Sequence, residues 1–165
     1  MDYETLRQLA EAGDWAGLAR ALVELFPQGL VGERDALVTF LVAKVGLAHK
    51  DAVKVAKALE LEGYAHHLPG DRPRWIFTSK PVDLLELMRM LDQEYKEFIG
   101  EGDEDPREAA LRFITKALNI DREVAEEVLE GLTAAGYAEP GYSPEAERDL
   151  VIFKFPDAFA MTYRV

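Results

Sequence analysis

Apolar residues recur at helical spacing in two segments of the chain that lie far apart. In residues 50–62 they fall at i, i+3, i+4 and i+7, the pattern of a helix that lies on a core. Residues 122–135 show the same pattern, and Gly63 and Gly136 end the two predicted helices. A shorter helix is expected before each, over 34–45 and over 106–118, with a turn at Gly46 or Asn119 between the helices of a pair.

An internal repeat with an offset of 73 residues connects these segments. Residues 38–65 align without a gap on residues 111–138, and seven of the 28 positions are identical. The remaining pairs keep their apolar character in helical phase, which is stronger evidence for a repeat than the identities alone. The identical pairs include Phe40/Phe113, Ala52/Ala125, Val55/Val128 and Leu59/Leu132.

Each second helix is followed by β-prone residues. In the first copy, the runs 64–68 and 74–78 flank a Pro-Gly-Asp turn and predict a hairpin. In the second copy we expect a longer loop over 140–148, followed by a strand over 150–155.

Three further segments surround the repeats. Residues 3–12 and 14–26 predict two short helices with Asp14 as the N-cap of the second, packed on the first copy. Residues 81–99 predict an amphipathic helix with Pro81 in its first turn, which packs between the copies or forms a dimer interface. Residues 100–105 read as a flexible acidic linker. The positions of a heptad-like seam in the helix are Leu84, Met88, Leu91, Tyr95 and Phe98.

The order helix, turn, helix, glycine, hairpin resembles the winged-helix (winged helix-turn-helix) superfamily. The phrase ALELEGYAHHLPGDRPRWIFT is similar to the end of a recognition helix and the wing in that superfamily. The resemblance implies an α+β fold, mainly α with small β-hairpins, and it supports fold more strongly than function. The expected domains are an N-terminal helical pair (1–30), a first winged helix (31–80), a connecting helix and linker (81–106) and a second winged helix (107–165).

Charge separates the two halves of the chain. The net charge is −12, but residues 1–80 carry ten Lys+Arg against eleven Asp+Glu, whereas residues 81–165 carry nine against twenty. Such an acidic chain repels polyanions on average, so any contact with nucleic acid must be local. The chain has no cysteine, no run near the ~20 apolar residues of a membrane span, and no basic start typical of a signal peptide. These features favour a cytoplasmic protein without a membrane partner.

The repeat aligns opposite charges on the outward faces of the two second helices. The first copy has Lys50, Lys54 and Lys57 in one row. The second copy has Glu123, Glu127 and Glu130 at the same positions, and Glu126 lies beside them. In a DNA-binding winged helix this face enters the major groove and the wing contacts the flanking backbone. The predicted nucleic-acid contacts are Lys50, Lys54, Lys57, Arg72 and Arg74.

Residue types that support catalysis are scarce. The chain has three histidines, and the adjacent pair His66-His67 does not suit one metal ion. No glycine loop is placed to bind phosphate, because Gly100 and Gly102 lie among carboxylates. Ser79 and Ser143 do not lie in a sequence motif that is typical of a catalytic nucleophile. We expect no enzyme, no cofactor, no metal site and no small-molecule substrate.

Three functional hypotheses remain. In the first, a regulatory protein binds duplex DNA through the first copy, and the second copy contacts protein through Glu123, Glu126, Glu127 and Glu130. In the second, the chain is an adaptor without DNA binding, since tandem winged helices of similar layout occur in kleisin-associated ScpB-type segregation proteins and ESCRT-II subunits. In the third, the lysine and glutamate rows meet, within a chain or across a dimer. Alternatively, either charged row is an ordinary solvated helix face with no binding role.

Overall fold

The computed structural model describes residues 2–93 and 96–156, which form the mixed α+β fold predicted from the sequence. The helices are α1 (Tyr3–Ala12), α2 (Trp15–Leu25), α3 (Ala36–Phe40), the π-helical turn η1 (Leu41–Val45), α4 (His49–Leu61), α5 (Leu84–Gln93), α6 (Pro106–Leu118) and α7 (Arg122–Ala134). The strands are β1 (Leu30–Val31), β2 (Ala65–Leu68), β3 (Arg74–Phe77), β4 (Glu97–Phe98), β5 (Ala138–Ser143) and β6 (Arg148–Phe153).

The N-terminal helices α1 and α2 form as predicted and are capped by aspartates. The Asp2 carboxylate accepts the Thr5 N–H at 2.8 Å, and the Asp14 carboxylate accepts the Gly17 N–H at 2.9 Å. Gly13 ends α1 in the left-handed conformation (φ 71°) that glycine adopts without a Cβ penalty. The buried faces of both helices join the core of the first repeat through Leu6, Leu18 and Leu22, which confirms the expected packing.

The two repeats share one topology. In the first repeat (31–80) the sheet order is β1-β3-β2, and in the second repeat (107–156 of the described residues, completed by β4) it is β4-β6-β5. All neighbouring strands are antiparallel. Gly46 (φ 85°) and Asn119 (φ 53°) take the left-handed conformation at the turns where the sequence predicted it. The three-dimensional arrangement therefore confirms the internal repeat.

Two element boundaries in the repeats differ from the prediction. The helix expected over 34–45 is α-helical only over α3 and continues as η1, a wider turn that keeps both Leu41 and Val45 buried. The loop expected over 140–148 is mostly strand, because β5 continues through Pro140 to Ser143 and pairs with β6. Pro140 has no N–H, but β5 is an edge strand, which tolerates proline.

The helix predicted over 81–99 is shorter than expected. It spans only α5, because the Val82 N–H bonds to Gly63 O at 3.0 Å and holds Pro81–Asp83 outside the helix. Phe98 belongs to β4 and pairs with Val151, so the prediction that placed it in the helical seam was wrong. Tyr95 lies outside the described residues. Leu84, Leu87, Met88 and Leu91 are buried in the intramolecular core, which favours packing over a dimer interface.

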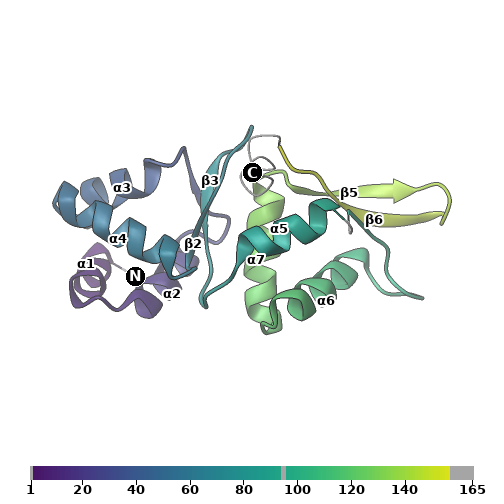
Figure 1. Cartoon of the computed structure of the whole chain (residues 1–165), viewed down its shortest axis with the longest axis horizontal. Helices are drawn as coiled ribbons and strands as arrows, with labels where there is room; N and C mark the ends of the chain where they lie inside the picture. The colour runs from purple at the N-terminus through teal and green to yellow at the C-terminus, as the bar shows by residue number, and fades with distance from the viewer. Residues whose placement is uncertain (1, 94–95, 157–165) are drawn as a thin grey trace.

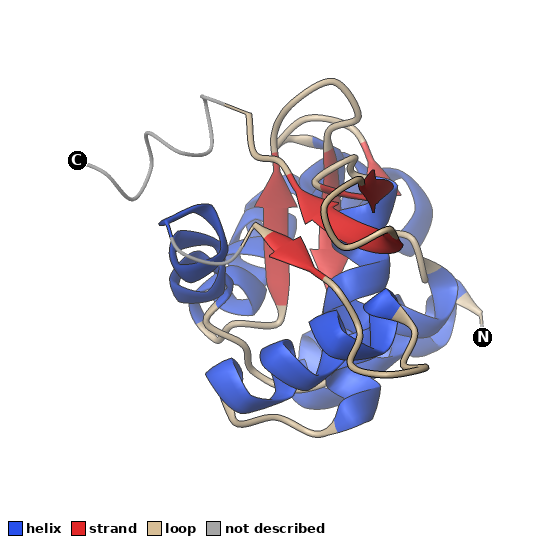
Figure 2. Cartoon of the chain, turned by 90° about the vertical axis from the view of Figure 1, so that its right-hand side faces the viewer, coloured by secondary structure: helices blue, strands red, loops and turns tan. Residues whose placement is uncertain are grey.

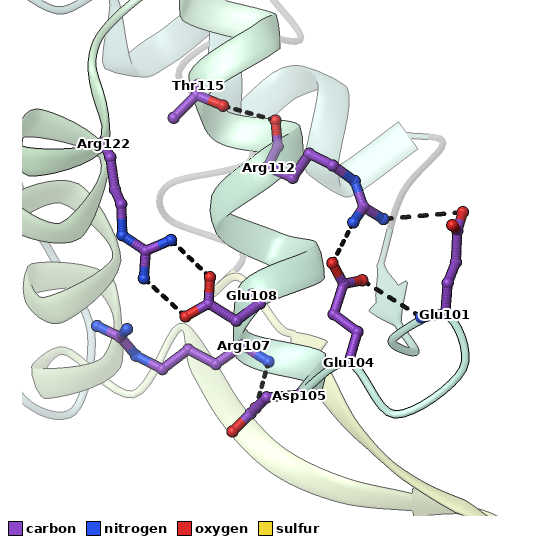
Figure 3. Close-up of polar contacts among 8 residues, drawn as sticks. All are labelled: Glu101, Glu104, Asp105, Arg107, Glu108, Arg112, Thr115 and Arg122. Atoms are coloured by element: carbon purple, nitrogen blue, oxygen red, sulfur yellow. Dashed lines mark hydrogen bonds and ion pairs between the residues drawn. The ribbon is translucent and has the colours of Figure 1, made fainter.

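The acidic segment before α6 is a compact turn rather than the flexible linker predicted (Figure 3). A Cβ on Gly100 would lie 1.9 Å from Glu104 O, so only glycine fits there. The guanidinium of Arg112 pairs with Glu104 and lies 3.9 Å from Glu101. Asp105 caps α6 by accepting the Arg107 N–H at 2.8 Å, and Arg122 forms two 2.6 Å bonds with Glu108 that join α7 to α6.

The two repeats pack against each other through the sheet of the first (Figure 1). One face of this sheet, with Trp75 and Phe77, belongs to the N-terminal core. The other face, with Leu68 and Ile76, belongs to the core of the second repeat. Viewed along the long axis, helices lie on several sides of the strands (Figure 2). All four residues of β3 are buried, as in a central element with a core on each side.

Candidate nucleic-acid interface

Helix α4 presents its basic face to solvent. Its apolar stripe is buried, which leaves Lys50, Lys54 and Lys57 exposed on the opposite side. None of the three lysines forms a hydrogen bond or ion pair with another described residue. The row therefore consists of three solvated ammonium groups that are available for an anionic ligand.

Arg7 adds a cation that sequence analysis missed. A groove of about 440 Å³ lies between α1 and the start of α4, lined by Arg7, Trp15 and Lys54 among others. The guanidinium of Arg7 bonds to Glu4 at 3.4 Å and lies 3.6 Å from Glu11, so its charge is partly compensated. Arg7 precedes Lys54 by 47 positions in the sequence, and the tertiary fold brings the two to one groove.

Helix α7, the counterpart of α4 in the repeat, directs part of its acidic row toward the N-terminal half of the chain. The Glu127 carboxylate accepts the Ser79 N–H at 2.7 Å and the Ser79 hydroxyl at 2.8 Å. The Glu130 carboxylate accepts from the Gln28 side-chain amide at 3.2 Å. Both acceptors bind groups from the N-terminal half of the chain, so part of the glutamate row lies in the contact between the repeats.

A glycine allows α7 to approach the first repeat closely. A Cβ on Gly131 would lie 2.7 Å from Ile76 Cγ2, inside van der Waals contact. Gly131 aligns with Ala58 of α4 in the repeat. The absence of a side chain at this position lets β3 pack directly on the helix.

The other two acidic residues have different surroundings. Glu126 pairs with Arg122 at 3.2 Å on the same helix. Glu123 is exposed, and its carboxylate forms no hydrogen bond or ion pair with a described residue. The four candidate glutamates therefore divide into Glu127 and Glu130, which bond to residues of the N-terminal half of the chain, and Glu123 and Glu126, which do not.

The hypothesis that the two rows meet is wrong within the chain. Glu127 and Glu130 contact Ser79 and Gln28, not Lys50, Lys54 or Lys57. The reason is geometric: α7 packs on the sheet of the first repeat, and α4 lies on the other side of that sheet. Contact between the rows of two copies stays a prediction.

The structure also removes Arg74 from the candidate interface. Its side chain is 9% exposed, donates from Nη1 to Gln28 O at 2.9 Å and donates from Nε to Arg72 O at 3.1 Å. Arg72 is exposed, but its guanidinium lies against Gly136, where a Cβ would be 2.6 Å from Nη2. Lys80 pairs with Asp121 at 2.7 Å. The first hairpin is therefore packed on the second repeat and does not project as a free wing.

The paired histidines of β2 serve the fold. His66 Nε2 lies 3.1 Å from the Thr78 hydroxyl, which itself donates to Gly63 O. Desolvation by burial lowers the pKa of His66 to about 4. His67 Nε2 lies 3.1 Å from Gly32 O, and its ring meets the Trp75 indole edge to face. Both rings are thus used inside the first repeat.

No protein-family model matches the chain, and no curated protein matches it. Within residues 2–93 and 96–156, no three His, Asp or Glu side chains are grouped to hold a metal ion. None of the helices in that part of the chain is long and apolar enough to cross a membrane.

Proposed function

We propose that the chain binds duplex DNA as a regulatory protein, through the outward face of α4. The observation that carries the proposal is the contrast between equivalent helices. The lysines of α4 are exposed and unpaired among the described residues, while two of the three glutamates at the same positions of α7, Glu127 and Glu130, bond to Ser79 and Gln28 in the N-terminal half of the chain. A basic helix face with no internal partner favours contact with phosphates.

The topology supports the winged-helix interpretation on which this proposal rests. In each repeat a short strand, two helices and a hairpin follow one another, and the last strand lies in the middle of the sheet. In that superfamily the second helix, here α4, contacts the major groove. Because the hairpin of the first repeat is packed on the second repeat, α4 and its neighbours carry the contact without a wing.

The expected mode of binding is electrostatic. Lysine contacts phosphate as a point charge, whereas the planar groups of arginine, asparagine and glutamine are better shaped for bidentate contacts with bases. The row supplies Lys50, Lys54 and Lys57 and no such residue. We therefore propose modest, strongly salt-dependent affinity with little sequence preference from α4 itself, and we propose no catalytic activity and a cytoplasmic location.

A salt titration of duplex binding tests the proposal. The logarithm of the affinity should fall linearly with the logarithm of the salt concentration, with a slope of about −0.9 for each phosphate contacted. The triple variant Lys50→Gln, Lys54→Gln, Lys57→Gln should reduce the magnitude of the slope by about 2.7. A charge-matched control, Lys96→Gln, Lys116→Gln, Lys154→Gln, should leave the slope nearly unchanged. Equal losses in both variants would rule out α4 as the interface.

A protein-interaction adaptor is the second candidate function, and the net charge of −12 favours it. An acidic chain disfavours contact with a polyanion except at a local basic surface. A partner that co-purifies after nuclease treatment, together with no duplex binding at low salt, would select the adaptor over the DNA-binding protein.

A further inference from the structure

A second surface of the molecule, unrelated to the lysine row, has the features of a peptide-docking groove. The groove has a volume of about 800 Å³ and runs along β2, between the end of α4 and the start of α5. Its lining residues come from the first repeat and from residues 81–85, which lead into α5. Its volume falls within the range of ligand-binding clefts.

Two leucines beside the groove are unusually exposed. Leu61, at the end of α4, is 82% exposed, and Leu85, in the first turn of α5, is 46% exposed. Both line the groove. Scattered surface leucines are ordinary, but two at one groove between packed helices provide apolar area for a partner to cover.

The rim of the groove is acidic. Glu33, Glu60, Glu62 and Asp83 line it, with Arg34 as the only Lys or Arg among the residues of its lining. The Arg34 guanidinium is already engaged, because it bonds to Glu60 at 2.7 Å and lies 5.1 Å from the centre of the Trp75 ring. The remaining carboxylates favour a cationic ligand.

The strand along the groove also offers backbone groups. Among the strands of residues 2–93 and 96–156, β2 pairs with β3 on one side only, and its other edge has no strand partner there. The Thr78 N–H bonds to Tyr64 O at 3.0 Å, so these two residues form a hydrogen-bonded pair of the antiparallel ladder. Hydrogen-bonded and non-hydrogen-bonded pairs alternate along such a ladder, so the pair of His67 and Trp75 is a non-hydrogen-bonded one. The backbone N–H and C=O of His67 therefore point away from β3. The backbone N–H and C=O of Ala65 point the same way, but Ala65 is buried, whereas His67 is only half-buried. His67 thus presents one donor and one acceptor in the groove.

From these features we propose that the groove docks an extended segment of a partner protein in which basic and apolar residues alternate. Alternating side chains of an extended segment point to opposite sides, so one set can cover Leu61 and Leu85 while the other meets the carboxylates. The backbone of the segment pairs with His67. A second copy of this chain is disfavoured as the occupant, since two acidic rims would face each other. The proposal does not depend on DNA binding by α4.

A designed peptide tests the docking site. The probe is an acetylated, amidated heptapeptide of alternating lysine and leucine, titrated into the whole chain and followed by NMR amide shifts and by calorimetry. We expect saturable binding with shifts at His67, Leu61 and Leu85. A peptide with glutamate in place of lysine should not bind. N-methylation of the alternate peptide groups that face His67 should weaken binding about tenfold, through loss of the backbone pair.

Matched variants separate the groove from general charge attraction. The pair Leu61→Ser and Leu85→Ser should weaken peptide binding about tenfold, because the exposed leucines no longer provide apolar contact. The pair Val53→Ser and Tyr142→Ser, at exposed apolar positions elsewhere, should not. Likewise Glu62→Gln with Asp83→Asn should weaken binding, and Glu123→Gln with Glu145→Gln should not.

Three results would overturn the proposal. One is the absence of shifts at His67 and Leu61 at saturating peptide, and another is equal weakening by the groove and control variants. The third is a dimer in sedimentation that Leu61→Ser with Leu85→Ser dissociates, which would make a second copy the occupant.

Discussion

At the residue scale, two glutamates in the same row of α7 have different surroundings. Glu127 and Glu123 lie in the same row of α7, yet the Glu127 carboxylate accepts two bonds from Ser79, while the exposed Glu123 carboxylate forms no hydrogen bond or ion pair with a described residue. In the sequence the two residues have the same type and the same helical phase. The bonds to Ser79 depend on a contact over 48 positions, which no local pattern encodes.

The variant Glu127→Ala should lower the free energy of unfolding by about 1–3 kcal/mol, because the Ser79 N–H and hydroxyl lose a charged acceptor. Glu123→Ala is the matched control, with a change of about 0.5 kcal/mol or less. Urea unfolding of both variants provides the comparison. Equal effects would contradict the role of Glu127 in the contact between the repeats.

His66 should make stability depend on pH. Its pKa in the folded chain is lowered to about 4 by burial, while the unfolded chain has the ordinary value of 6.5. The unfolded state therefore binds more protons between these values, and stability falls as the pH is lowered through this window. The total loss is on the order of 1–3 kcal/mol. The variant His66→Phe should lack this part of the pH dependence in urea unfolding followed from pH 7 to pH 4; an unchanged profile would contradict a buried neutral His66.

At the scale of elements, the sequence predicted what depends on local periodicity and chain termination. The helices α1, α2, α4, α6 and α7 follow from apolar spacing and from caps such as Asp14 and Gly63. The prediction failed where a tertiary bond overrode the periodic pattern. Val82 bonds to Gly63 before α5 can begin, and Phe98 pairs with β6 although it continues the helical spacing.

The candidate interface was predicted only in part for the same reason. The exposed row of Lys50, Lys54 and Lys57 follows from the apolar stripe on the opposite face of α4. The packing of the Arg72 and Arg74 side chains does not follow from the helical pattern, because it depends on how the rest of the chain packs against the first hairpin. An exposed arginine in a hairpin and a buried arginine that bonds to backbone carbonyl groups have the same local sequence context.

Gly131 should be intolerant of larger side chains, because α7 and β3 approach closely there. The variant Gly131→Val should lower the free energy of unfolding by about 1–3 kcal/mol through overpacking against Ile76. Thr133→Val places the same side chain on an exposed position of the same helix and should be close to neutral. The comparison is made by thermal or urea unfolding, and tolerance of Gly131→Val would show that α7 does not pack on β3 as described.

At the scale of the whole molecule, one sheet serves two cores. Trp75 and Phe77 pack into the N-terminal core while Ile76 and Leu68 pack into the core of the second repeat. Neither repeat can unfold without exposing apolar side chains of the other. This coupling makes the contact between the repeats part of the fold, while the basic face of α4 stays exposed.

Such coupling predicts a single cooperative transition in urea. Both tryptophans, Trp15 and Trp75, report on the N-terminal core, while far-UV circular dichroism reports on all helices. The two probes should give the same midpoint and the same slope. Separate transitions, with the tryptophan signal following only one of them, would contradict a shared core.

The central claim is that the two equivalent helices have divided their roles, with α4 available to DNA and α7 packed within the molecule. Amide chemical-shift mapping of the whole chain with a short mixed-sequence DNA duplex at low salt tests it most directly. The account predicts shifts concentrated over residues 49–57 that diminish as salt is added. Shifts concentrated on α7 instead, or none on α4 at the lowest salt concentration, would contradict it.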